Sequence, residues 1–130
     1  MEPDQDAVEL AHRMFDLARE GSTAELAAYV DAGVPVNLTD PKGDTFLILA
    51  AYHRHPDTVA ALLERGADPA RENDRGQTAL AAATFAQSAE AVTALLDAGA
   101  DPAQGSPSAR ETVQFFDLPA MAELLDRQPG

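Results

Sequence analysis

Residues 64–103 read ERGADPARENDRGQTALAAATFAQSAEAVTALLDAGADPA, and the segment closes on nearly the phrase with which it opens. ERGADPA at 64–70 returns as DAGADPA at 97–103, and the related phrase DAGVPVN stands at 31–37. The glycines of the three phrases, Gly33, Gly66 and Gly99, are equally spaced along the chain. A constant spacing of this kind predicts a chain built from similar structural units arranged in a row.

An apolar triplet with the spacing i, i+3, i+4 precedes each glycine and marks one face of a helix. The first three triplets repeat at the same interval as the glycines: Leu26, Tyr29, Val30; Val59, Leu62, Leu63; Val92, Leu95, Leu96. A fourth, formed by Met121, Leu124 and Leu125, follows the third after a smaller interval, so the last unit is shortened. Gly66 and Gly99 stand where left-handed helix caps belong, and a proline three residues later prevents either helix from continuing.

A shorter helix is predicted ahead of each triplet in the two middle units. DPKGDTFLILAAYHRH at 40–55 aligns with NDRGQTALAAATFAQS at 73–88, so that a glycine, a threonine and small residues recur in register. The glycine allows the positive φ of a tight turn, and Thr45 and Thr78 are predicted N-caps. The alanines that follow would let a neighbouring helix approach closely. The unit therefore consists of a turn, a short helix, a longer helix and an extended loop.

This unit resembles the ankyrin repeat, which has a period of about 33 residues and a consensus of roughly DxxGxTPLHxAAxxGHxxVVxLLLxxGADxN. The two middle units match it best, although the TPLH box reads TFLI at 45–48 and TALA at 78–81. The resemblance implies an all-α fold, an ankyrin-repeat solenoid of about four stacked helix-turn-helix repeats with protruding loops and short β-turns. Stacking also meets an energetic need, because one helix pair cannot bury enough apolar surface to offset the ordering of its chain.

The resemblance extends over residues 7–127, with flexible ends expected at 1–6 and 128–130. The expected repeats lie near 7–39, 40–72, 73–105 and 106–127. The first repeat lacks its opening turn, and its first helix, near 7–18, is expected to cap the stack.

The side chains at both ends fit such caps. Met14, Phe15 and Leu17 are available to face inward from the first helix. At the other end, Val113, Phe115 and Phe116 are expected to cover the third repeat, and Pro119 is expected to open the last short helix.

The composition limits the class of protein. A chain of 130 residues with 45% hydrophobic content suits one domain. Nine basic against 22 acidic residues give a net charge of -13, which repels nucleic acids and anionic membranes. The absence of cysteine excludes disulfides, thiolate metal sites and a Cys nucleophile. With no secretory signal and no long apolar run, we expect a soluble, cytoplasmic protein, and richness in Ala, Pro, Asp and Arg suggests a bacterial source.

No residue pattern for catalysis is visible, because the chain lacks GxSxG, GxGxxG and GxxxxGK motifs. His53 and His55 are two residues apart, so they do not share a helix face. In the family that the chain resembles, the position of His55 caps the interhelical turn, and Asp68 and Asp101 are expected to make turn hydrogen bonds. We therefore expect neither an enzyme nor a cofactor, and the rival hypothesis is a catalytic or metal-dependent protein that uses His12, His53 or His55.

Ankyrin-like stacks generally bind proteins, and the resemblance places the contact surface on the concave side, at the loop tips and the exposed part of each first helix. Side chains can vary there without disturbing the stacked core. The candidate partner-binding residues at these places are Lys42, Asp44, Tyr52, His53, Asp74, Arg75, Gln77, Phe85 and Arg110.

Tyr52 and Phe85 are separated by one full repeat and therefore occupy the same place in successive units. The chain has five Phe, two Tyr and no Trp, so two aromatic residues at a variable position suggest anchors of a binding interface. The alternative is that the two rings pack against each other and the alanine-rich helices as part of the core.

The three loop tips, 40–44, 71–77 and 104–110, carry no net charge, so the charge of -13 lies elsewhere. Loop tips with both positive and negative side chains suit a partner surface that also carries charges of both signs. Alternatively, these charges serve only solubility. The principal hypothesis is a monomeric, non-catalytic module that binds an unidentified protein through its concave surface, without nucleic acid, membrane or small-molecule substrate. The alternatives are an acidic inhibitor or escort that covers a basic partner with its negative convex face, and a structural subunit that self-associates through an imperfectly capped end.

Overall fold

The structure is a computed structural model that describes residues 5–127. Within this range the chain forms eight helices: α1 (Gln5–Glu20), α2 (Thr23–Asp31), α3 (Phe46–Tyr52), α4 (Pro56–Glu64), α5 (Ala79–Ala86), α6 (Ala89–Asp97), α7 (Ala109–Phe116) and α8 (Pro119–Asp126). The predicted flexible ends lie outside the described residues, except for Gln5 and Asp6. These two residues are helical, so the first helix begins earlier than its sequence indicated.

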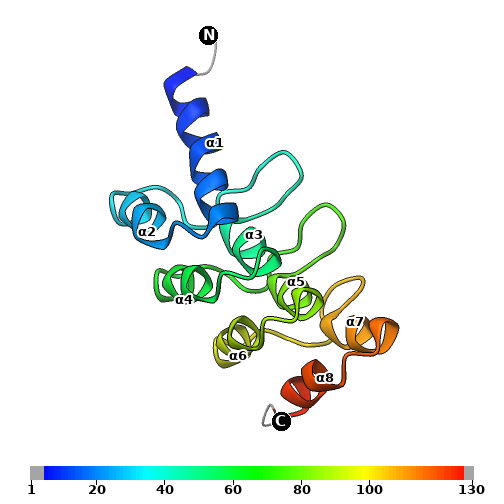
Figure 1. The fold of residues 1–130 in the computed structure, drawn as a ribbon. Helices are drawn as coiled ribbons and strands as arrows, with labels where there is room; N and C mark the ends of the chain where they lie inside the picture. Colours follow the sequence, from blue (N-terminus) through cyan, green and yellow to red (C-terminus); the bar gives the residue numbers. More distant parts are fainter. Residues whose placement is uncertain (1–4, 128–130) are drawn as a thin grey trace.

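The helices form two parallel rows (Figure 1). The inner row consists of α1, α3, α5 and α7, and the outer row consists of α2, α4, α6 and α8. The loops that lead into α3, α5 and α7 project from the inner row on one side of the molecule. Each inner helix packs on the next inner helix and on its own outer helix. This arrangement confirms the predicted all-α solenoid of stacked helix pairs.

Local signals in the sequence account for the start of each inner helix. Thr45 Oγ1 accepts the backbone N–H of Ile48 at 3.1 Å, and Thr78 Oγ1 accepts that of Ala81 at 3.1 Å. The turn before Thr45 contains Gly43 with φ 78°, a backbone conformation that is strained for a residue with a side chain. The predicted N-caps are therefore confirmed, and α3 and α5 begin where the repeat register places them.

The inner row packs through very small side chains. Ala50 and Ala51 of α3 and Ala82 and Ala83 of α5 are completely buried. Because an alanine side chain ends at Cβ, α3 and α5 can approach each other closely along their whole length. The larger apolar side chains predicted to line the outer helices are either almost fully buried, such as Leu62, or partly buried against the core, such as Leu63. One continuous core therefore runs through the stack.

The N-terminal end of this core is closed as predicted. Met14, Phe15 and Leu17 of α1 are buried, and the ring of Phe15 packs on that of Phe46 in α3 with centroids 4.8 Å apart. Helix α1 therefore provides the apolar cover that α3 requires on this side.

His55 holds the first two helix pairs together. Its Nε2 lies 2.8 Å from the backbone oxygen of Arg19, at the end of α1. Its ring packs so closely over Gly21, where φ is 74°, that a Cβ at that position would collide with it. The structural role predicted for His55 is confirmed, although its hydrogen bond reaches the preceding helix pair and not its own turn. Asp68 and Asp101 make the predicted turn bonds, each accepting the N–H two residues later at 2.9 Å.

The C-terminal end differs from its prediction. Pro119 opens α8 as expected, and Val113 is partly buried against the core. Phe115 and Phe116, however, are 83% and 48% exposed and do not cover the core of the third repeat. The reason is that α7 buries Ala109 and Thr112, near its start, whereas both phenylalanines stand at its last turn.

The close approach of α3 and α5 leads to a stability prediction. Replacing Ala82 by Leu adds three carbons where no space exists, so Ala82→Leu is expected to lower the free energy of unfolding by about 1–3 kcal/mol. Urea denaturation followed by circular dichroism measures this change. Ala120→Leu, at an exposed position of α8, is the matched control and should stay within about 0.5 kcal/mol of the parent protein. Equal stability of both variants would show that the inner helices are not in close contact.

Candidate functional site

The loops that lead into α3 and α5 are hairpins, each organised by one side chain. Asp40 Oδ1 accepts the backbone N–H groups of Lys42 and Asp44, both at 2.9 Å. One repeat later, Asn73 Oδ1 accepts those of Arg75 and Gln77, at 3.0 and 2.9 Å. These bonds satisfy backbone donors that the tight turn would otherwise leave unpaired. The tips are therefore ordered without help from a ligand.

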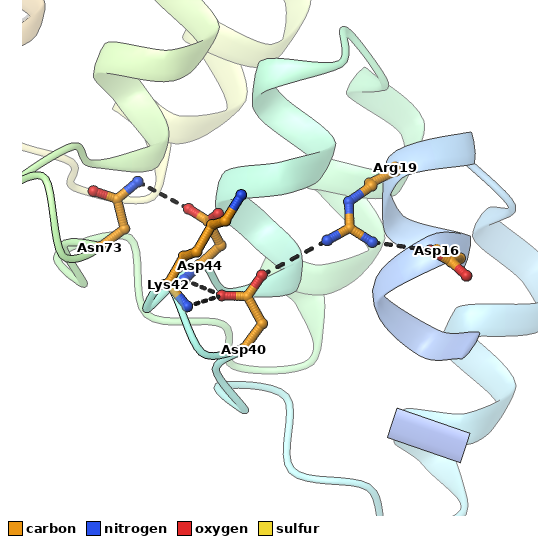
Figure 2. Close-up of polar contacts among 6 residues, drawn as sticks. All are labelled: Asp16, Arg19, Asp40, Lys42, Asp44 and Asn73. Carbon is orange, nitrogen blue, oxygen red and sulfur yellow. Dashed lines mark hydrogen bonds and ion pairs between the residues drawn. The ribbon is translucent and has the colours of Figure 1, made fainter. Parts of the chain in front are cut away.

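Neighbouring hairpins are also joined to each other. The N–H of Asp74 donates to the carbonyl of Lys42 at 3.0 Å, and the N–H of Ser106 donates to the carbonyl of Gly76 at 3.0 Å. Asn73 Nδ2 donates to the carboxylate of Asp44 at 2.8 Å (Figure 2). The hairpins therefore form one connected row in front of the inner helices.

Arg19 connects this row to α1. Its guanidinium lies between two carboxylates, 2.9 Å from Asp16 and 3.7 Å from Asp40, as Figure 2 shows. The side chain of Asp40 is only 8% exposed, so its charge is balanced by Arg19 and by the two N–H groups of its own hairpin. Helix α1 and the first hairpin consequently form the two walls of one groove.

The groove has a volume of about 610 Å³. It runs between α1, the hairpins and the exposed side of α3. Its predicted binding residues are Lys42, Asp44, Tyr52, His53, Arg75 and Gln77. Residues of α1 line the opposite wall, with His12 and Asp16 among them. The sequence did not single out this wall as a binding surface, because the first repeat lacks the opening turn that marks the concave side elsewhere.

An aromatic row continues from the groove along the stack. Tyr52 and Phe85 stack with ring centroids 6.0 Å apart and an interplanar angle of 14°. Phe116 meets Phe85 edge-on at 5.2 Å, and Phe115 meets Phe116 at 4.9 Å. Tyr52 and Phe85 remain 42% and 43% exposed. The two rings therefore contact each other, as one hypothesis held, but they do so on the surface and not in the core.

The last two members of the aromatic row, Phe116 and Phe115, were not predicted as binding residues. Phe116 follows Phe85 after slightly less than one full repeat, so the repeat period misses it. Counting from the N-cap of each inner helix would have found both, because Phe115 stands seven residues after Ser108, as Tyr52 stands seven after Thr45, and Phe116 takes the place of His53.

Two predicted binding residues have other roles. Asp44 is only 7% exposed, because its carboxylate accepts the amide of Asn73 from the next hairpin. Arg110 pairs with Asp126 of α8 at 3.0 Å, which directs its guanidinium to the end of the stack and away from the groove. Asp44 is thus occupied by an interaction between repeats, and Arg110 by an interaction within the last repeat. Asp74 is exposed at the second hairpin tip, outside the groove lining.

His53 is the titratable group most affected by the groove. Burial lowers its pKa from the ordinary 6.5, and the nearby His55 and Arg19 lower it further by repulsion. Its ring meets that of Tyr52 edge-on with centroids 5.2 Å apart. Within the described residues no three His, Asp or Glu side chains are placed to hold a metal ion. The groove therefore presents hydrogen-bonding, cationic and aromatic groups, but no assembled catalytic set of the kind that nucleophilic or metal chemistry requires.

The family model for ankyrin repeats (3 copies) matches residues 14–105. The chain belongs to the ankyrin-repeat family. The solved ankyrin repeat domain of human ASB11 superposes on 90% of this chain and on 54% of its own length, with a TM-score of 0.76 and 29% sequence identity. The repeats of this chain are therefore ankyrin repeats in both sequence and fold.

Curated relatives match about half of the chain. A Pseudomonas aeruginosa protein named for its ankyrin repeats is 47% identical over 58 residues, which are 45% of this chain and 34% of that protein. Oxysterol-binding protein-related protein 1 of the rat is 43% identical over 63 residues, which are 47% of this chain but 7% of that protein. The matched part thus spans about a third of the bacterial relative and a small part of the mammalian one.

Ankyrin repeats generally act as non-catalytic modules for protein–protein interaction. Every helix between residues 5 and 127 is too short or too polar to cross a lipid bilayer.

The environment of His53 predicts a pH effect. The unfolded chain takes up a proton at His53 near pH 6.5, whereas the folded chain resists it, so the free energy of unfolding should fall as the pH drops below about 6.5. The decrease caused by His53 ends once the pH falls below the pKa of His53 in the folded protein. His53→Gln should therefore lose less stability than the parent protein when both are denatured by urea at pH 7 and at about pH 5.5.

His12→Gln, which removes an exposed imidazole from the opposite wall, is the control. An NMR titration should also place the midpoint of His53 below the ordinary value of 6.5. A midpoint above this value would contradict the cause assigned here.

Proposed function

We propose that this ankyrin-repeat protein binds a partner protein through its concave surface, with the groove and the aromatic row as the contact area. The binding residues proposed are Lys42, Tyr52, His53, Asp74, Arg75, Gln77, Phe85, Phe115 and Phe116. The proposal includes a monomeric protein in the cytoplasm, in keeping with the charge of -13, which opposes self-association.

The exposed stack of Tyr52 and Phe85 carries this proposal. Aromatic side chains are large and lose little entropy on binding, and they are enriched among residues that dominate the energy of interfaces. In this protein, Tyr52, Phe85 and Phe116 place such side chains side by side on three successive inner helices. Leaving this apolar surface exposed to water is unfavourable, and its exposure is best explained if another macromolecule covers it in a complex.

Removing both anchors should abolish tight binding. Tyr52→Ala combined with Phe85→Ala is expected to weaken a partner's affinity by about 30-fold or more, since truncating one anchor typically costs about 2 kcal/mol. Partners crosslinked to the parent protein in lysate of the source cell would first be identified by mass spectrometry. Their affinities for both proteins would then be measured by calorimetry.

Leu10→Ala is the matched control, because it removes an apolar side chain of similar exposure from α1, outside the groove. It should leave the affinity unchanged. A partner that binds the double variant as tightly as the parent protein would refute the proposed surface.

A second candidate function is an acidic inhibitor or escort of a basic partner. The observation that favours it is that every outer helix ends with an acidic residue: Asp31, Glu64, Asp97 and Asp126. None of these helices has a basic residue in its last turn, although the helix dipole favours positive charge there. Asp31 and Asp126 pair with Arg65 and Arg110, so the exposed Glu64 and Asp97 are the unfavourably placed acids consistent with selection for binding.

Salt separates the two candidates. Binding through the acidic convex side should weaken steeply between about 0.05 and 0.5 M salt, because exposed charges are screened. It should also weaken in Glu64→Gln combined with Asp97→Asn. Binding through the aromatic row should change little in either case, and the opposite result would favour the inhibitor or escort.

A further inference from the structure

Some Lys and Arg side chains of this acidic protein form ion pairs with carboxylates and others do not. Six of its nine Lys and Arg residues pair with a carboxylate in the structure: Arg13, Arg19, Arg65, Arg71, Arg110 and Arg127. Lys42, Arg54 and Arg75 make no ion pair with any described residue. With 22 acidic residues in the chain, an unpaired cation is the exception, so its position is informative.

Two of these three cations lie together. Lys42 and Arg75 stand on the tips of successive hairpins, and both line the groove beside Tyr52. The backbone bond from Asp74 to Lys42 fixes the spacing of the two tips. Arg54 lies outside the groove, at the turn between α3 and α4.

Of the carboxylates on the two hairpins that carry these cations, Asp40 and Asp44 are already used, and Asp74 is exposed at the second tip outside the groove lining. Asp40 faces Arg19 and accepts two backbone N–H groups, and its side chain is 8% exposed. Asp44 is 7% exposed and accepts the amide of Asn73. Both acids therefore lie beneath the surface, and the mouth of the groove presents the two cations. A ligand that brings its own carboxylate would complete this arrangement.

Given the partner binding proposed above, on which this step rests, we infer that the groove takes a peptide segment in which a carboxylate stands next to apolar side chains. The carboxylate of an Asp or Glu meets Lys42 and Arg75. The apolar side chains cover Tyr52 and Phe85. The charge fixes the direction of the segment, and the aromatic contacts supply most of its affinity.

The bound segment need not be strongly acidic. The protein as a whole carries a charge of -13, so a partner with many acidic residues would be repelled at long range. One carboxylate in the groove is attracted locally, because it lies closer to Lys42 and Arg75 than the Debye length of about 8 Å at physiological salt. The segment therefore combines a single acid with neighbouring Leu, Ile, Phe or Trp residues.

A random peptide library displayed on phage tests this inference with the intact protein as bait. Peptides recovered by the parent protein should be enriched in Asp or Glu adjacent to large apolar residues. Lys42→Glu combined with Arg75→Glu should lose the acidic enrichment and select Lys or Arg at the same place. Circular dichroism confirms that each bait is folded.

The most enriched peptide, made synthetically, provides the affinity test. Lys42→Gln combined with Arg75→Gln should weaken its binding by about three- to tenfold, the range expected for two exposed charge pairs. Arg54→Gln combined with Arg71→Gln changes the net charge equally outside the groove, and it should leave the affinity unchanged.

The outcomes separate this inference from the proposed function. Peptides that require Tyr52 and Phe85 but show no acidic enrichment would overturn the inference and leave the function intact. Acidic enrichment that persists with the Lys42→Glu and Arg75→Glu bait would also overturn the inference alone. Peptides that bind the Tyr52→Ala and Phe85→Ala variant equally well, or no enriched peptide at all, would count against both.

Discussion

The close approach of one inner helix to the next is the constraint on which this structure depends. Helices α3 and α5 pack on each other, and Ala50, Ala51, Ala82 and Ala83 of these two helices are completely buried. A single pair has too little apolar surface to offset the entropy of ordering its chain, so each pair is stable only with a neighbour on at least one side. The order of the helices, the single core and the common direction of the loops all follow from this requirement.

The same stacking builds the candidate site. Because α3 and α5 are in contact, the hairpins in front of them are near enough for Asn73 to bind Asp44 across the gap. Tyr52 and Phe85 are brought into register by the same contact and stack on the surface. The binding surface is therefore not an addition to the fold, since the interactions that stabilise neighbouring repeats also set the distances between the groups offered to a ligand.

The repeat period predicts the helices, the Thr45 and Thr78 caps and the common position of Tyr52 and Phe85, and the resemblance to the ankyrin repeat predicts the structural role of His55. The period reports where a residue stands within its own repeat, but not which side chains of other helices or hairpins it meets. Asp44 and Arg110 show this limit, because each is occupied by a partner from another helix or hairpin. Phe116 was missed because the last unit is shortened, and the wall formed by α1 was missed because its repeat has no opening turn.

Besides the side-chain bond between Asn73 and Asp44, successive hairpins are joined by backbone bonds, from Asp74 to Lys42 and from Ser106 to Gly76. Main-chain bonding is indifferent to the side chains that the tips carry, so those side chains can diverge during evolution while the pitch of the tips stays constant. The repeats therefore hold the loop tips at a constant spacing, while the side chains on those tips are free to change. A new binding specificity requires only substitutions of the tip side chains.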